Sequence, residues 1–258
     1  MKEKVILVSI DGMRPDGALA CGHPFVGEMM ERGACTLASR TVFPSVTLPC
    51  HMSMFHSVPP ERHGITTNLY MPFARPLPGL AEQIARAGGV CAMYYNWEPM
   101  RDVARPGSMK YAEFIECYSA EGTDGQLADA AIARIRASAP DFVYLYMVET
   151  DDKGGHDHGW MTPEYLGYVR AAIDNVRRVW EAAGGEYTML VTADHGGHDR
   201  SHGTELPEDM TVPLFCLGPR FTPGRTLTDV TILDVAPTVA DVMGVAPAPE
   251  WEGRSLAQ

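Results

Sequence analysis

The sequence lacks any long hydrophobic run. Near the N-terminus, residues 5–10 form the first apolar stretch, which Asp11 ends. This stretch is too short for the core of a signal peptide and is typical of a buried strand. No other segment approaches the ~20 consecutive apolar residues needed to cross a bilayer. We therefore expect no membrane partner.

Paired cysteines and excess positive charge are also missing. No CxxC pair or regular framework spacing occurs, which predicts reduced thiols in a cytoplasmic protein. Lys and Arg number 21 against 33 Asp and Glu, giving a net charge of −12. This balance argues against a broad nucleic-acid surface. An acidic protein that handles anionic phosphate would need local positive charge, which bound metal ions can supply. The cysteines concerned are Cys21, Cys35, Cys50, Cys91, Cys117 and Cys216.

Strand-like apolar runs alternate with helix-like segments along the chain. The predicted strands are residues 5–10, 90–95, 142–148, 187–193 and 212–217. The predicted helices are residues 24–32, 47–56, 78–87, 125–137, 163–183 and 233–243. Such alternation predicts an α/β fold with a mostly parallel central sheet and helices on both faces. We expect one domain over residues 1–258, in which the Pro- and Met-rich region 70–119 forms a small cap that shapes specificity.

Three of the predicted strands run directly into carboxylates. These are Asp11, the pair Asp151 and Asp152, and Asp194. Because the carboxyl ends of parallel strands share one edge of the sheet, the three endings are expected to converge there. Each Asp taken alone could instead cap a following helix. Histidines beside two of the three endings favour a common site.

Five histidines gather in the two loops that follow the later carboxylates. Two histidines follow the 151–152 pair and three follow Asp194, and a cluster of this kind is typical of a metal site. Mixed Asp and His ligation suits zinc, and manganese or iron would also fit. We therefore expect two divalent metal ions. The histidines are His156, His158, His195, His198 and His202.

The nucleophile is expected in residues 43–51, which supply Ser45, Thr47 and Cys50. Thr47 stands just before Pro49, a proline placed where a helix can begin. There its hydroxyl would feel the positive helix terminus and could reach a metal ion, and both favour the ionised form. The alternative is that Thr47 serves only as a helix N-cap.

Together these motifs resemble the nucleotide pyrophosphatase/phosphodiesterase (type I phosphodiesterase) family of the alkaline phosphatase superfamily. Residues 5–14 resemble its opening strand and first metal-binding Asp, residues 43–51 its nucleophile motif, and residues 60–68 the segment whose Asn contacts a phosphate oxygen. Residues 155–159, 193–196 and 202–204 resemble its remaining metal-binding segments, and residues 234–238 and 252–256 its closing helix and loop.

The resemblance implies a minimal-size alkaline-phosphatase-like fold and a divided set of metal ligands. One ion would be held by Asp11, Thr47, Asp194 and His195, and the other by an Asp of the 151–152 pair, His156 and His202. The usual Asp-x-x-Gly-His spacing selects Asp152, whereas the Thr150-Asp151 context selects Asp151 and implies one extra loop residue. His158 and His198 are expected to support the ligands or to face solvent.

The activity implied is metal-dependent hydrolysis of a small-molecule phosphate ester, such as a phosphodiester or nucleotide pyrophosphate. Thr47 would form a phospho-enzyme intermediate, and Asn68 would donate a hydrogen bond to a phosphate oxygen. The alternatives on this scaffold are a phosphomonoesterase, a phosphonate hydrolase and a non-catalytic metal-binding domain. A sulfatase would need a Cys/Ser-x-Pro-x-Arg motif, and a cofactor-independent phosphoglycerate mutase is expected to use Ser and a large second domain. Tyr94, Tyr95 and Trp97 are candidates either for stacking on a leaving group or for core packing.

Overall fold

The molecule is built around an eight-stranded sheet in the order β4-β3-β5-β1-β6-β7-β2-β8. The computed structural model describes residues 1, 3–73, 75–118 and 120–258. Most neighbouring strands are parallel, and β7 is antiparallel to both β6 and β2. This confirms the predicted, mostly parallel sheet. The strands are β1 (Lys4–Ile10), β2 (Ala34–Arg40), β3 (Cys91–Tyr95), β4 (Tyr111–Phe114), β5 (Phe142–Met147), β6 (Tyr187–Thr192), β7 (Thr211–Leu217) and β8 (Arg225–Thr226).

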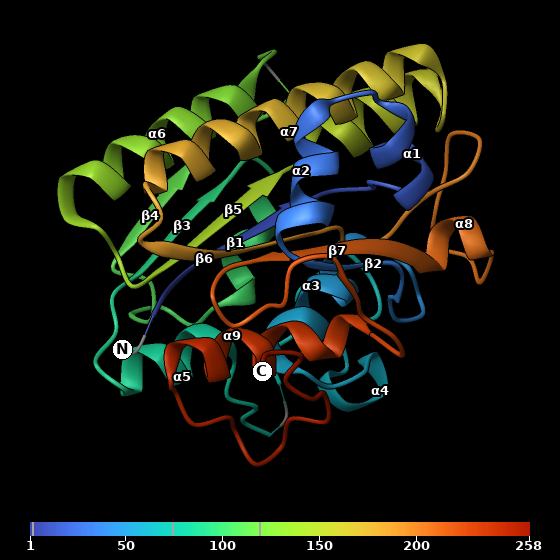
Figure 1. The fold of residues 1–258 in the computed structure, drawn as a ribbon. Helices are drawn as coiled ribbons and strands as arrows, with labels where there is room; N and C mark the ends of the chain where they lie inside the picture. The colour runs from blue at the N-terminus through green and yellow to red at the C-terminus, as the bar shows by residue number, and fades with distance from the viewer. Residues whose placement is uncertain (2, 74, 119) are drawn as a thin grey trace.

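Helices cover both faces of the sheet (Figure 1). On one face lie α1 (Pro15–Ala20), α2 (Pro24–Arg32), α6 (Thr123–Ser138) and α7 (Pro163–Ala183). On the other lie α3 (Thr47–His56), α4 (Pro60–His63), α5 (Leu80–Arg86) and α9 (Val235–Met243). Shorter turns are η1 (Glu98–Val103), the π-helix η2 (Thr150–His158), α8 (Pro207–Met210) and η3 (Ile232–Asp234).

The central strand β1 shows why both faces need cover. Val5 and Leu7 belong to one buried apolar cluster, whereas Ile6, Val8 and Ile10 belong to the other. Successive side chains of a strand point to opposite faces, so a strand that is apolar throughout must be buried on both sides.

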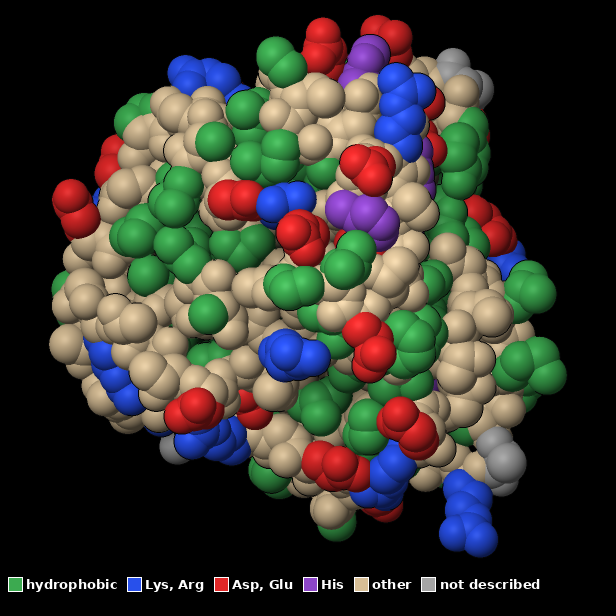
Figure 2. Space-filling model, turned by 90° about the vertical axis from the view of Figure 1, so that its right-hand side faces the viewer, with side chains coloured by type: hydrophobic (Ala, Val, Ile, Leu, Met, Phe, Trp, Pro, Cys, Tyr) green, Lys and Arg blue, Asp and Glu red, His purple; other side chains and the backbone are tan. Residues whose placement is uncertain are grey.

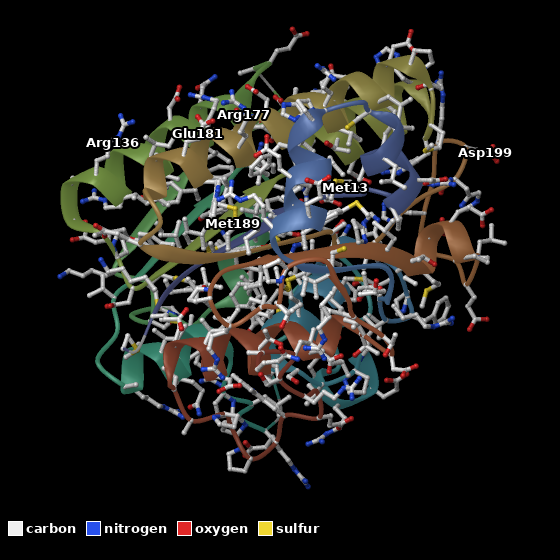
Figure 3. The ribbon with its side chains drawn as sticks, viewed as in Figure 1. Met13, Arg136, Arg177, Glu181, Met189 and Asp199 are labelled. Carbon is white, nitrogen blue, oxygen red and sulfur yellow. The ribbon has the colours of Figure 1, made fainter. Side chains whose placement is uncertain are left out.

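Helix α7 illustrates how local sequence sets the bounds of an element. The Thr162 side chain caps its start by accepting the Tyr165 N–H, and Pro163 occupies the first turn. Gly184, with φ 58°, ends it in the left-handed conformation that favours glycine. Its outer face carries the ion pair Arg177–Glu181 at 2.6 Å, visible above the sheet in Figure 3.

The predicted helices at 24–32, 47–56 and 163–183 are confirmed with unchanged bounds. Strands β2 and β4 were not predicted, because their sequences show no sustained alternation and β4 lies largely exposed at the sheet edge. The region 70–119 contains the helix α5 and contributes two strands, β3 and β4, to the main sheet; its residues 74 and 119 lie outside the described residues. Within the described ranges, no helix is both long and apolar enough to span a bilayer.

Two glycines near α2 give a test of the packing between α2 and β7. A Cβ atom on Gly33 would lie 2.2 Å from the Cys216 carbonyl oxygen, whereas one on Gly27 would meet nothing within 4 Å. We predict that Gly33→Ala lowers the free energy of unfolding by about 1–3 kcal/mol through overpacking. Gly27→Ala should raise it by about 0.5–1 kcal/mol, because alanine is the better helix former. Urea denaturation of both variants checks the pair, and equal stabilities would contradict the close approach at Gly33.

Candidate metal centre

The expected carboxylates meet at one edge of the sheet. Asp11 follows β1, Asp151 follows β5 and Asp194 follows β6, and these three strands are neighbours in the order β5-β1-β6. Their carboxyl ends lie on the side that carries the loops of Met13 and Asp199, toward the right in Figure 3. Adjacent parallel strands thus bring together residues far apart in sequence.

One group consists of Asp11, Asp194 and His195, each of which is fully buried. His195 Nε2 lies 3.3 Å from Asp11 Oδ1 and 3.4 Å from Asp194 Oδ2. Thr47 Oγ1 lies 3.3 Å from the same nitrogen. The four side chains expected around the first ion are therefore brought together.

A second group consists of Asp151, His195 and His202. Asp151 Oδ1 lies 3.9 Å from His202 Nε2, and Asp151 Oδ2 lies 3.3 Å from His156 Nε2. The rings of His195 and His202 stack with centroids 3.8 Å apart. The residues expected around the second ion adjoin the first group, with His195 between the two.

Backbone carbonyls fix the three histidine rings. Each ring donates a hydrogen bond through its Nδ1–H group: His156 to Arg200 O (3.0 Å), His195 to Gly196 O (2.7 Å) and His202 to Ser45 O (2.9 Å). In each ring this leaves Nε2 as the lone-pair nitrogen on the side of the carboxylates. An imidazole held by its other nitrogen is typical of metal-binding histidines.

Three carboxylate oxygens in this cluster are buried and receive no hydrogen bond from the described residues: Asp11 Oδ1, Asp151 Oδ1 and Asp194 Oδ2. Burial and the neighbouring carboxylates raise the pKa of Asp11 well above its usual range, and they raise that of Asp194 to about 8. A buried carboxylate oxygen without a donor is costly unless a cation compensates it. The donor set of Asp oxygens and His nitrogens therefore fits divalent metal ions.

The π-helix η2 distinguishes Asp151 from Asp152. A π-helix bonds residues five apart, as in the 3.2 Å bond from Gly159 N to Gly154 O, and so takes up one more residue per turn than an α-helix. Asp151 and His156, also five apart, consequently come to the same side. Asp152 pairs instead with Lys153, at 3.3 Å between Oδ2 and Nζ. The extra loop residue implied by the Asp151 alternative is thus accommodated in the wide turn.

Thr47 lies at the first position of α3, where backbone N–H groups lack acceptors within the helix. Val46 is the N-cap residue, and the structure gives the helix no capping bond from a side chain. Asn68 lies beside Thr47, and its Oδ1 accepts the Leu48 N–H at 3.0 Å. The placement does not support Thr47 as a helix cap.

The two groups open into a cavity of about 150 Å³. Figure 2 looks onto this side of the molecule, where histidine side chains reach the surface among acidic ones. A larger cavity of about 740 Å³ between α2, β2 and residues 226–231 contains neither group. The walls of the smaller cavity are Asp11, Thr47, Asn68, Trp97, Tyr118, Val148, Asp151, Asp152, His156 and His202.

Trp160 packs against the loops that carry the candidate ligands, and the sequence analysis did not identify it. Its indole N–H donates to Gly12 O at 2.8 Å. A Cβ atom at Gly155 or Gly197 would lie 2.5 Å or 2.2 Å from its ring, so both glycines are needed for this contact. Each of the three glycines stands one or two residues from an expected ligand. That regularity was the available signal, although it does not identify the ring.

Two further buried side chains contact the ligands and were given no role from sequence. The Tyr146 hydroxyl donates a short hydrogen bond to Asp11 Oδ2. His51 donates through Nδ1 to Thr47 O at 2.8 Å, and its Nε2 lies 3.1 Å from Ser9 Oγ. Spacing offered a partial signal, because Thr47 and His51 are one helical turn apart.

The remaining predicted histidines lie away from the two groups. His198 Nδ1 pairs with the buried Asp209 at 2.8 Å, and Asp209 also accepts the Thr204 N–H at 2.9 Å. His198 thereby braces the loop that carries His202. His158 is exposed. Neither belongs to a group of candidate ligands among the described residues.

Substitution of Trp160 tests whether metal binding at the candidate centre depends on the packing of the ligand-bearing loops against this ring. If the two groups hold zinc, Trp160→Leu should lower zinc affinity by about 10–100-fold, because the ligand loops lose their common contact. Trp180→Leu, the same change in the distant half of α7, should have little effect. Competition with a chromophoric chelator measures the affinity, and circular dichroism checks the fold. Equal zinc affinity in the two variants would remove Trp160 from the centre.

Curated proteins with similar sequences match about half of this chain. A phosphoglycerate mutase (2,3-bisphosphoglycerate-independent) of Methanosarcina acetivorans is 29% identical over 138 residues, covering 51% of this chain and 26% of the relative. A phosphopentomutase of Pectobacterium atrosepticum is 27% identical over 129 residues, covering 50% and 31%. The chain thus spans about a quarter to a third of the length of these curated relatives.

Solved structures share the fold over nearly the whole chain. Murine ectonucleotide pyrophosphatase/phosphodiesterase 5, an inactive Thr-to-Ala variant in complex with AMP, superposes with a TM-score of 0.80 at 16% identity, covering 96% of each chain. A phosphonate monoester hydrolase of Agrobacterium radiobacter gives a TM-score of 0.78 at 15% identity, covering 98% of this chain and 76% of that one. These similarities confirm the alkaline-phosphatase-like fold.

Two family models match the chain and confirm the resemblance drawn from its motifs. The model of the type I phosphodiesterase / nucleotide pyrophosphatase family matches residues 5–77, which include Asp11, Thr47 and Asn68. The metalloenzyme superfamily model matches residues 99–247, more than half of the chain, including Asp151 and Asp194. The chain belongs to the metalloenzyme superfamily, and its N-terminal part carries the type I phosphodiesterase / nucleotide pyrophosphatase signature.

Proposed function

We propose that this protein hydrolyses phosphodiesters at a two-metal centre, with Thr47 as the nucleophile. The observation that carries the proposal is the position of Thr47 Oγ1, at the start of α3 and 3.3 Å from His195 Nε2. A hydroxyl there adjoins both groups of candidate ligands and the positive end of a ten-residue helix.

Two divalent ions, most simply zinc, would fit the two groups. Asp11, Thr47, Asp194 and His195 would hold one. Asp151 and His202 of the second group, together with the neighbouring His156, would hold the other. When bound, the ions supply positive charge that stabilises the phosphate in the transition state and favours ionisation of the Thr47 hydroxyl. The three buried carboxylate oxygens without donors support this assignment.

The covalent step uses the Thr47 oxygen itself. Its Oγ1 loses its proton and forms a bond to phosphorus while the bond from phosphorus to one ester oxygen breaks, and the departing alkoxide takes up a proton to leave as the alcohol. The oxygen of a water molecule then loses a proton and bonds to phosphorus as the bond between Oγ1 and phosphorus breaks. Oγ1 regains a proton, and the phosphate monoester is released. His51 holds the first turn of α3 through the Thr47 carbonyl and so keeps the hydroxyl aimed at the cavity.

Asn68 is proposed to stabilise charge on the phosphate. Its side-chain oxygen is already used in accepting the Leu48 N–H, and the residue lines the cavity beside Thr47. Its amide NH₂ group would therefore donate to a non-bridging phosphate oxygen, where negative charge grows in the transition state.

Substitution of Thr47 tests the nucleophile. We predict that Thr47→Ala lowers kcat by at least about 1,000-fold and leaves at least one metal ion in place. The melting temperature should change little, since no capping bond is lost. Thr47→Ser should keep part of the activity, because a hydroxyl remains. Ser53→Ala, on the same helix, should reduce stability through the lost bond to His63 and keep the rate per folded molecule.

Rate, zinc content and melting temperature should be measured on the same samples of each variant. An alanine variant that turns over at near wild-type rate would shift attention to Ser45 or to direct attack by water. Zinc-loaded wild-type protein without turnover on any phosphate ester would favour a non-catalytic metal-binding protein.

The charge of the cavity wall favours diesters over monoesters. The described residues that line it include no Lys or Arg, and Asp152 adds a carboxylate. A dianionic monoester would therefore meet more repulsion than a monoanionic diester. A monoesterase or phosphonate hydrolase is the second candidate, because the same ligands and Thr47 would serve it.

We predict a higher kcat/KM for bis-p-nitrophenyl phosphate than for p-nitrophenyl phosphate, measured with one zinc-loaded preparation. The missing cationic side chain is the physical reason. A preference for the monoester of tenfold or more, about 1.4 kcal/mol of transition-state stabilisation, would instead place the protein among the monoesterases.

A further inference from the structure

A second cavity lies at the opposite end of the sheet from β3 and β4. It has a volume of about 740 Å³ and shares no lining residue with the cavity of the candidate metal centre. Strands β2 and β8, which stand last in the strand order, both contribute to its walls. Pockets for drug-sized ligands measure about 300–1,000 Å³, so the space is large enough for a small organic molecule.

An interruption in the pairing of β2 creates this space. Cys35 pairs with Thr226, and Arg40 forms a bridge with Thr231, so the two segments keep the same parallel register at both ends. Between these pairs, residues 36–39 have no ladder partner on that side within the described part of the chain. The two segments therefore separate and meet again, and the cavity lies between them.

A β-bulge explains why the ladder opens. The pairing of β2 with β7 shifts register between Thr36 and Ser39, and a bulge of this kind bends its strand. The Thr36 hydroxyl accepts the Ala38 N–H at 3.1 Å and so satisfies a backbone group within the bulge. The opening is therefore a structured feature of β2.

The walls of this cavity are mainly apolar. Leu227 and Val230 are buried, and Leu37 on the facing strand is partly buried. An aliphatic chain that entered would remove apolar surface from water, which is favourable. The apolar side chains in the wall are those of Met30, Cys35, Leu37, Ala38, Leu227 and Val230.

The charged side chains in the wall are those of Arg40 and Asp229. The exposed Arg40 side chain has no ion-pair or hydrogen-bond partner among the described residues, Asp229 included. Arg254 Nη2 donates to the Asp229 carbonyl oxygen at 3.1 Å, so a second guanidinium group stands beside this segment. Two guanidinium groups thus accompany one carboxylate here, in a protein whose net charge is −12. Arg40 is therefore placed to receive an anion.

We infer that this cavity binds a small molecule with an aliphatic chain and one carboxylate. The chain would lie against the apolar wall, and the planar guanidinium group of Arg40 would pair with both carboxylate oxygens. A ligand with a cationic end would instead be repelled by Arg40. The site does not depend on the proposed hydrolase function, because neither group of candidate metal ligands contributes to it.

Octanoate and its neutral counterpart 1-octanol, which differ at one end, test the site. Isothermal titration calorimetry should give a Kd at least about 10-fold lower for octanoate. Arg40→Gln should bring the two affinities together, because the pairing of charges is lost. Ala38→Trp should abolish binding of both, since an indole from the exposed rim would fill the cavity. Arg136→Gln, which changes an exposed arginine of α6, is the matched control and should keep the wild-type preference.

The titrations should agree between zinc-free and zinc-loaded protein, with circular dichroism as a check of the fold. Equal affinities of the wild-type protein for octanoate and octanol, or no octanoate binding, would overturn the inference. Unchanged octanoate binding in folded Arg40→Gln or Ala38→Trp would overturn it as well. Binding that requires zinc would assign octanoate to the candidate metal centre instead. None of these results bears on hydrolysis of phosphate esters, so the site and the proposed function can fail separately.

The position of the bound molecule can be followed by NMR of methyl-labelled methionines. Octanoate should shift the methyl resonance of Met30, which lines the cavity and is assigned by its loss in Met30→Leu. The resonance of Met13, which follows Asp11 by two residues and is labelled in Figure 3, should stay in place. A shift of Met13 without one of Met30 would place octanoate near the candidate metal centre and overturn the assignment.

Discussion

Negative charge concentrated at the ends of three adjacent strands governs this structure. Asp11, Asp151 and Asp194 are each buried, and each has an oxygen without a hydrogen-bond donor among the described residues. Carboxylates packed so closely repel one another, and burial removes the water that would screen them. Divalent cations would relieve this repulsion, and they would also bring positive charge to a cavity whose described lining residues include no Lys or Arg. The repulsion between the buried carboxylates and the capacity to bind phosphate would thus both depend on the same bound cations.

Such a cluster needs a rigid support, which comes from packing beneath the loops. Trp160 contacts Gly12, Gly155 and Gly197, one glycine from each ligand-bearing loop, and bonds to the first through its indole N–H. Larger side chains at these positions would push the Trp160 ring away. Because glycine has no side chain, all three loops can pack against the flat face of this one ring. The π-turn of η2 adds a second constraint. It brings Asp151 and His156, which are five residues apart, to the same side, as an α-helical turn would not.

In the proposed function, the reactive groups and the cavity wall that would select substrates come from different parts of the chain. The candidate ligands and the proposed nucleophile stand directly after β1, at the start of α3, in η2 and in the loop after β6. The cavity wall that would distinguish substrates comes from the segments after β3 and β4, next to the exposed edge of the sheet. A wall built from separate segments can change without disturbing the candidate metal ligands, so one fold can serve different functions.

The sequence by itself determined the alternation of strands and helices, the three carboxylate endings and the position of Thr47 at the start of a helix. These features are local, because apolar runs, strand ends and prolines act on their immediate neighbours. Only the tertiary structure showed that Asp151, rather than Asp152, lies in a group of candidate ligands, because its position depends on a π-turn whose hydrogen bonds are set by its surroundings. It also brought Trp160, Tyr146 and His51 against the ligands. Contacts between residues so distant in sequence follow from strand order and packing, which no local pattern encodes.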